Sequence, residues 1–111
     1  MGVEYMIFRD DNKTIFNLGK MPARWIDLDV AILTRPENEI TAHLISLGVD
    51  GSSSYLYLLR DRLLDFANGA SAESLKLVDD TSDYGWSDDQ LQYQQTHDRY
   101  CTNAEIEAYS A

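Results

Sequence analysis

Large apolar residues alternate with polar ones along the first part of the chain in a pattern typical of two β-strands. Within residues 3–8, apolar side chains occur at both odd-numbered and even-numbered positions, and residues 14–18 form a second apolar run. The sequence Asp10-Asp11-Asn12-Lys13 between them is typical of a turn. We therefore predict a β-hairpin. Because the first strand is apolar on both faces, we expect it to lie inside a sheet that is covered on both sides.

Two later segments show helical spacing. Ile40, Leu44 and Leu47 follow Pro36, a residue that suits a first helical turn. A strand through residues 40–44 is the alternative for this segment. Residues 55–66 give the stronger pattern, because apolar side chains recur there every three or four positions after a serine-rich loop that can cap a helix. We predict an amphipathic helix over these residues that packs on the sheet.

Shorter signals complete the predicted fold. Residues 75–78 are apolar enough for a third strand, and Thr102 with Glu105 has the spacing of a capping box, which predicts a final helix over residues 103–109. Residues 25–34 fit a strand and a helical face equally well. Together these elements predict an α+β fold with a small, mostly antiparallel sheet and two or more packed helices.

The length and composition predict one domain, residues 1–111, with one hydrophobic core. The chain has 111 residues, of which 44% are hydrophobic. Cys101 is the only cysteine, so no intramolecular disulfide can form. Residues 1–9 lack the basic flank and long apolar run of a signal peptide, and no apolar segment has the roughly 20 residues needed to cross a bilayer. We therefore expect a cytoplasmic protein that makes no membrane contact.

The net charge of −10 is concentrated in the last third of the chain. Residues 71–111 contain nine acidic and two basic residues, which gives −7 and leaves −3 for the first seventy residues. Phosphate groups of nucleic acids bind lysine and arginine, so a surface of this sign repels nucleic acid directly. The composition instead favours a basic protein as partner.

Aromatic side chains lie among the carboxylates in residues 79–98, which contain six aspartates and neither lysine nor arginine. Trp and Tyr are enriched at binding hot spots, and carboxylates around them would speed association with a basic partner. Residues 79–93 are here termed the acidic-aromatic segment. In the alternative interpretation its rings belong to the core and its aspartates form a solvated loop. The predicted partner-binding residues are Asp79, Asp80, Asp83, Tyr84, Trp86, Asp88, Asp89 and Tyr93.

No catalytic residue, metal site or cofactor is predicted. His43, His97 and Cys101 are too isolated in the sequence for a zinc site, and residues 79–91 fail the calcium-loop pattern at its ligand and glycine positions. Motifs for phosphate binding or nucleophilic catalysis are also missing from the sequence. His97 and Cys101 would share one face if their segment were helical, which is the one Cys/His pair that a small enzyme could use.

These patterns favour protein binding over catalysis. The predicted function is that of an acidic inhibitor, a bacterial toxin-immunity protein that neutralises a basic toxin or nuclease by occluding its active cleft. Three alternatives stay open. They are a phage-type DNA mimic that inhibits a defence nuclease, a small enzyme that uses clustered carboxylates or the His97/Cys101 pair, and a structural subunit of a homo-oligomer. The sequence identifies neither the partner nor the oligomeric state.

Overall fold

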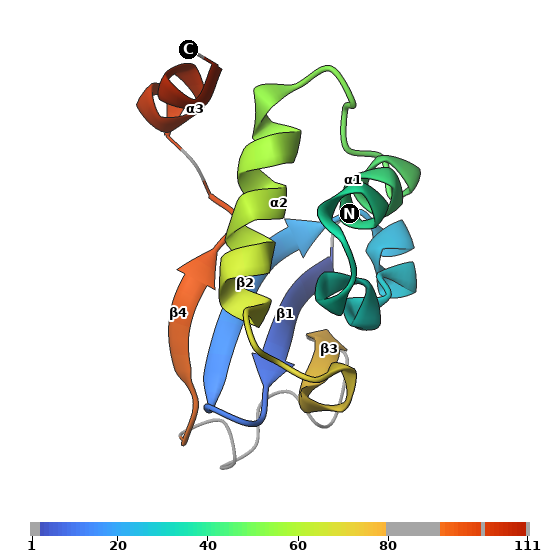
Figure 1. The fold of residues 1–111 in the computed structure, drawn as a ribbon, viewed down its shortest axis with the longest axis vertical. Helices are drawn as coiled ribbons and strands as arrows, with labels where there is room; N and C mark the ends of the chain where they lie inside the picture. The colour runs from blue at the N-terminus through green and yellow to red at the C-terminus, as the bar shows by residue number, and fades with distance from the viewer. Residues whose placement is uncertain (1–2, 80–91, 101, 111) are drawn as a thin grey trace.

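A four-stranded sheet forms the centre of the computed structural model, which describes residues 3–79, 92–100 and 102–110 (Figure 1). Its strands are β1 (Val3–Arg9), β2 (Thr14–Met21), β3 (Leu75–Asp79) and β4 (Gln94–Asp98), in the order β3-β1-β2-β4. β1 pairs antiparallel with both β2 and β3, whereas β4 pairs parallel with β2. The predicted α+β fold with a mostly antiparallel sheet is therefore confirmed, although the sheet is mixed.

The predicted hairpin is the first element of the sheet. Its register shifts between Tyr5 and Met6, where β2 contains an extra residue. Gly19 lies next to the extra residue, and its backbone φ of +67° is one that residues with a Cβ rarely adopt. The Asn17 side chain accepts a hydrogen bond from the Gly19 backbone N–H at 2.9 Å, which fixes the bend locally.

Three α-helices follow the predicted positions. They are α1 (Glu37–Ser46), α2 (Ser54–Ala67) and α3 (Asn103–Ser110). The alternative of a strand over residues 40–44 is wrong, because Ile40 and Leu44 lie one helical turn apart and are both buried on the same side of α1. The Ser53 hydroxyl accepts a hydrogen bond from the Tyr55 backbone N–H at 3.1 Å and so caps α2, as the loop sequence predicts.

Residues 25–34 are neither a strand nor an α-helix. They contribute to two short 3₁₀ helices, η1 (Ala23–Asp27) and η2 (Val30–Thr34), and a third, η3 (Ala72–Ser74), precedes β3. Tight turns at these positions bury Trp25, Leu28 and Leu33, while the Asp29 side chain accepts a hydrogen bond from the first turn of η2. The ambiguous pattern reflects these short turns, since each holds too few residues to show a period.

Buried apolar side chains lie on both faces of the sheet at β1. Tyr5 and Ile7 point into the main core, where α1, α2 and the 3₁₀ helices pack on the sheet. Phe8 points to the opposite face and joins a smaller cluster with Ile15 and Val78. The alternation of side chains along one strand therefore supplies two separate apolar clusters.

The last elements add little to this core. None of the described side chains after Asp79 is fully buried, and those of β4 are exposed or half-buried. We refer to β4, Arg99, Tyr100 and α3 together as the C-terminal strap. In Figure 1 its strand lies along one edge of the sheet, and α3 lies beyond the end of the sheet next to the start of α2.

Candidate functional site

The acidic-aromatic segment is described only at its two ends. Asp79 is the last residue of β3, and Tyr93 directly precedes β4, so these two residues lie at opposite edges of the sheet. Both belong to the predicted partner-binding set. The other members lie outside the described residues: Asp80, Asp83, Tyr84, Trp86, Asp88 and Asp89.

Tyr93 packs against the hairpin. Its ring centroid lies 5.1 Å from that of Phe8, and its hydroxyl donates a short hydrogen bond to the Asp10 carboxylate. The Lys13 ammonium lies 4.9 Å from the centre of the same ring. The half-buried Tyr93 ring therefore covers the smaller apolar cluster and fixes one end of the acidic-aromatic segment to the hairpin.

Most basic side chains are paired with carboxylates of the chain itself. At least five of the nine basic residues form ion pairs with carboxylates of the described residues: Arg9, Arg35, Arg60, Arg62 and Lys76. All nine lie within the described ranges. The exposed pairs among them, such as Arg35 with Glu39, add little stability, but every pair cancels a positive charge locally. The unbalanced negative charge therefore belongs to carboxylates that have no cation beside them.

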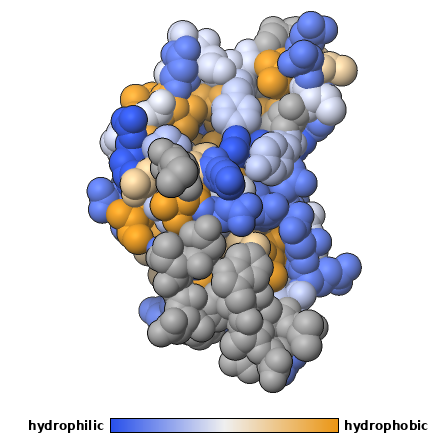
Figure 2. Space-filling view, turned by 180° about the vertical axis from the view of Figure 1, so that it is seen from behind, coloured by the Kyte–Doolittle hydropathy of each residue, from blue (hydrophilic) through white to orange (hydrophobic). Residues whose placement is uncertain are grey.

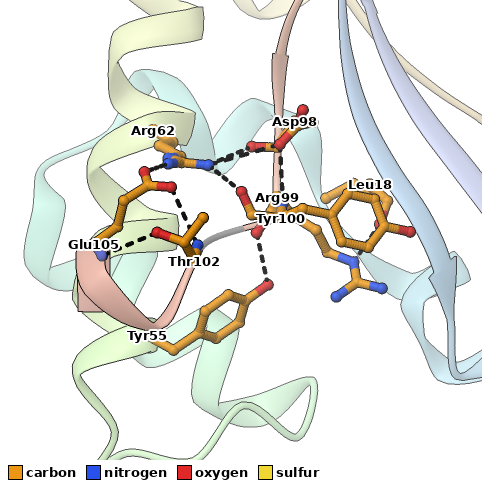
Figure 3. A network of polar contacts seen from close by, with 8 residues as sticks. All are labelled: Leu18, Tyr55, Arg62, Asp98, Arg99, Tyr100, Thr102 and Glu105. Atoms are coloured by element: carbon orange, nitrogen blue, oxygen red, sulfur yellow. Dashed lines mark hydrogen bonds and ion pairs between the residues drawn. The ribbon is translucent and has the colours of Figure 1, made fainter. Parts of the chain in front are cut away.

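Arg62 joins α2 to the C-terminal strap (Figure 3). Its guanidinium donates to the Tyr100 carbonyl at 2.6 Å and to the Asp98 carbonyl at 3.3 Å, and it forms a short ion pair with Glu105. The Asp98 carboxylate lies 3.7 Å from the same guanidinium. One arginine on α2 thus contacts β4, the residues after it and α3.

Arg99 fastens the strap to β2 from the other side. Its guanidinium donates to the Leu18 carbonyl and, at 2.9 Å, to the Lys20 carbonyl. The Arg99 carbonyl accepts a hydrogen bond from the Tyr55 hydroxyl at 3.3 Å (Figure 3). Residues on both sides of the strap therefore hold it by directional polar contacts, with little buried apolar area.

Glu105 takes part in the contacts between α2 and the C-terminal strap, and it also forms the predicted capping box. Its backbone N–H donates to the Thr102 hydroxyl, and its carboxylate accepts from the Thr102 backbone N–H, both at 3.1 Å. The bond from the Thr102 N–H, with help from the nearby Arg62 guanidinium, lowers the pKa of the Glu105 carboxyl below its ordinary value. The carboxylate is therefore ionised at neutral pH and can hold both partners.

His97 lies in strand β4, so the helical arrangement under which His97 and Cys101 would share one face is not present at the histidine. Cys101 lies outside the described residues. Strand pairing fixes this segment instead, because His97 is opposite Phe16 and its ring is stacked on that of Phe16 at 6.1 Å. The His97 Nε2 atom lies 2.7 Å from an Asp65 carboxylate oxygen on α2. These contacts give the histidine a structural role between β4 and α2.

A shallow cleft of about 370 Å³ opens beside His97. It is lined by Arg62 and by residues 95–98 of β4. Thr96 is the extra residue of a β-bulge, and its hydroxyl lies 2.8 Å from the His97 Nδ1 atom. Arg62, Asp98 and His97 are all engaged with neighbouring groups of the chain. The cleft therefore offers a polar surface whose charged groups already have partners.

The polar contacts of Arg62 and Arg99 with the C-terminal strap and β2 are not predicted from the sequence. The segment Gln94–Asp98 contains no apolar residue and so lacks the alternation by which a strand is recognised. Arg62 and Arg99 bind backbone carbonyls that lie far along the chain, and no spacing rule relates such partners. Among these polar contacts, only the capping box of Thr102 and Glu105 joins residues close enough in the chain for the sequence to predict it.

Within residues 3–79, 92–100 and 102–110, no helix is both long and apolar enough to cross a membrane. Within the same ranges, no three His, Cys, Asp or Glu side chains come together in an arrangement that could hold a metal ion.

Comparison of this chain with models of known protein families, with curated proteins and with solved structures gives no match.

Proposed function

We propose that this chain is an acidic protein-binding inhibitor, of the kind that confers immunity to a toxin. Its partner is a basic toxin or nuclease, whose active cleft it covers through the acidic-aromatic segment. The observation that carries the proposal is the run from residue 79 to residue 98, which contains six aspartates, three aromatic residues and no lysine or arginine. A basic cleft that binds nucleic acid is complementary to such a run.

The internal ion pairs support this proposal. Because five basic side chains already contact carboxylates of the same chain, few are left to offset the negative surface. Within the described ranges, exposed carboxylates lie without a cation at ion-pair distance on several elements: Glu4, Asp27, Glu73 and Glu107. The long-range field of the molecule is therefore negative, and it would attract a basic partner before contact.

The attachment of the segment also supports a binding role. Its first residue ends β3, and Tyr93 at its other end is packed on Phe8 and bonded to Asp10. A segment that starts and ends on the same rigid sheet loses less entropy on binding than a free tail does. We therefore assign recognition to the residues between these two anchors.

The test measures binding to the purified product of the neighbouring reading frame. Changing Asp83, Asp88 and Asp89 together to Asn should slow association by about tenfold, because charges that steer a partner toward an interface act mainly on the association rate. Surface plasmon resonance at two salt concentrations gives this rate, and higher salt should reduce the difference between wild type and variant.

A second triple variant controls for net charge. Glu4→Gln, Asp27→Asn and Glu73→Gln remove three exposed carboxylates from other parts of the surface. Both triple variants therefore change the net charge from −10 to −7. We expect the control variant to bind like the wild type. Equal weakening by the two variants would show that total charge matters and the segment does not, and unchanged binding by the first variant would remove the proposed surface.

A further inference from the structure

A continuous chain of contacts joins a hydroxyl, an imidazole and a carboxylate where β4 lies against α2. The Thr96 hydroxyl lies 2.8 Å from the His97 Nδ1 atom, and the His97 Nε2 atom lies 2.7 Å from an Asp65 carboxylate oxygen. Thr96 and His97 belong to β4, whereas Asp65 belongs to α2. Hydrolases that form acyl intermediates join a nucleophile, a general base and a group that orients the base in the same order.

The β-bulge in β4 accounts for the contact between two neighbouring residues. In a regular strand, consecutive side chains point to opposite faces of the sheet, so a hydroxyl and the next ring would lie apart. The pairing of β4 with β2 shifts between Ile15 and Phe16, and Thr96 is the residue without a partner in this register. Because the extra residue interrupts the alternation, the Thr96 hydroxyl reaches the ring of His97.

The Asp65 carboxylate fixes the tautomer of the imidazole. An ionised carboxylate can only accept a hydrogen bond, so the neutral His97 ring carries its hydrogen on Nε2 and donates it to Asp65. The Nδ1 atom then presents its lone pair to the Thr96 hydroxyl. In this state a histidine can take a proton from a hydroxyl group.

Aromatic packing fixes the orientation of the base. The centroid of the His97 ring lies 6.1 Å from that of Phe16, on which it stacks, and 5.6 Å from that of Phe66, which it meets in a T-shaped arrangement. The His97 side chain still has 24% of its surface exposed, and Thr96 is exposed. A base of fixed orientation therefore lies beside an accessible hydroxyl.

The shallow cleft beside His97 gives a substrate access to this hydroxyl. Thr96 and His97 both line the cleft, and Arg62 forms part of its wall. A fixed cation near a reacting carbonyl stabilises the negative oxygen that forms there. The carboxylates of Asp98 and Glu105 contact Arg62 and reduce this effect, so we expect slow turnover. The volume of about 370 Å³ suits a small substrate.

We propose that Thr96, His97 and Asp65 hydrolyse small neutral esters, an activity independent of the proposed inhibitor function. A neutral ester is favoured because the net charge of −10 repels anions. The Thr96 oxygen attacks the carbonyl carbon as its proton passes to His97 Nδ1, and the alcohol leaves with that proton, which makes the acyl group an ester of Thr96. Water then gives a proton to Nδ1 and attacks this ester, and the acid leaves as the proton returns to the Thr96 oxygen. Asp65 stays ionised throughout and is a positioning residue.

The experiment treats the full chain with p-nitrophenyl acetate after the Cys101 thiol has been blocked with N-ethylmaleimide. A burst of p-nitrophenolate is expected, with an acetyl group on Thr96 that mass spectrometry of peptides locates. Thr96→Ala should lower the hydrolysis rate by about tenfold to a hundredfold, and Thr96→Ser should retain the activity. Because Thr96 is exposed, its removal tests the chemistry without disturbing the core.

His97→Gln and His43→Gln form a matched pair, since both remove a half-buried histidine and only the first lies beside Thr96. The first variant should lower the rate as Thr96→Ala does, and the second should leave it unchanged. Asp65→Asn should also change the imidazole nitrogen NMR signals of His97 from one tautomer to a mixture, because an amide can donate as well as accept. Hydrolysis unchanged in Thr96→Ala, acetylation of other residues alone, or equal loss in the two histidine variants would overturn the proposal.

Discussion

At the scale of single residues, Arg9 is the most consequential charged group of the fold. It is the one charged residue among the described side chains that is buried, with 8% of its surface exposed, and it lies in β1, one of the two inner strands. Its guanidinium donates to the Phe66 and Asn68 carbonyls at 2.8 and 2.9 Å, where α2 ends, and it pairs with Asp11. Arg9 therefore satisfies carbonyls at the C-terminus of α2 that have no partner within the helix.

Replacing Arg9 by methionine should lower the free energy of unfolding by about 2 to 3 kcal/mol, since buried carbonyls would lose charged donors while the apolar bulk is kept. Urea denaturation monitored by circular dichroism measures this difference. The control is Arg35→Met, which removes an exposed pair with Glu39 and should change stability by less than about 0.5 kcal/mol. Equal losses in the two variants would contradict the role given to Arg9.

Local signals in the sequence predict residue roles only where the partners are close in the chain. The capping box at Thr102 and the serine cap of α2 are both recognised, because each joins residues two or three positions apart. Arg9 reaches carbonyls more than fifty positions away, so its role depends on the folded topology. The contacts of Arg62 and Arg99 likewise depend on the folded topology, because their partners lie far from them in the chain.

At the scale of elements, the molecule divides into an apolar body and a polar attachment. The body contains β1, β2, β3, α1 and α2, which share the main core. The C-terminal strap is held by Arg62, Arg99 and the His97–Asp65 contact. Elements with few buried apolar contacts open at lower free energy than the rest of a fold. We therefore expect the strap to open before the body does.

Arg62→Ala should raise hydrogen-exchange rates in α3 and at Tyr100 by about tenfold, because charge-assisted bonds to the strap are lost. Exchange in β1 and in the middle of α2 should stay as in the wild type. Mass spectrometry of exchanged peptides separates these regions. Arg60→Ala serves as control, since Arg60 lies on the same helix and pairs with Asp61 and Glu37 away from the strap. Uniform acceleration over the whole chain would contradict an independent strap.

Element prediction from the sequence succeeds where apolar periodicity is strong. The hairpin, α1, α2 and β3 each bury a regular apolar pattern, and the pattern identifies them. β4 has no such pattern, because it is a polar edge strand that pairs through its backbone alone. The 3₁₀ helices η1 and η2 are too short to show a period.

At the scale of the whole molecule, charge is the dominant property. Because the net charge is −10, the excess carboxylates of this small molecule repel one another, and exposed ion pairs offset this repulsion only slightly. The sequence predicts both the sign of the charge and its concentration after residue 70. It does not predict where the flanks of the acidic-aromatic segment attach, since β4 has no sequence signal.

Raising NaCl to about 0.2 M should increase the melting temperature by a few degrees at pH 7, because salt shortens the Debye length to below about 10 Å and screens the self-repulsion. Differential scanning calorimetry checks this result. Near pH 4.3, where the net charge approaches zero, the same salt should have little effect. A melting temperature that falls with salt at pH 7 would show that the ion pairs contribute more than the repulsion removes.

The late position of the strap in the chain has a consequence for synthesis on the ribosome. Every buried hydrophobic residue of the described core lies at or before Val78, so the body can fold on the ribosome while β4 is still inside the tunnel. β4 pairs with a strand made about eighty residues earlier, and this pairing waits until β4 has itself left the tunnel. A nascent chain would therefore expose the edge of β2 until β4 emerges.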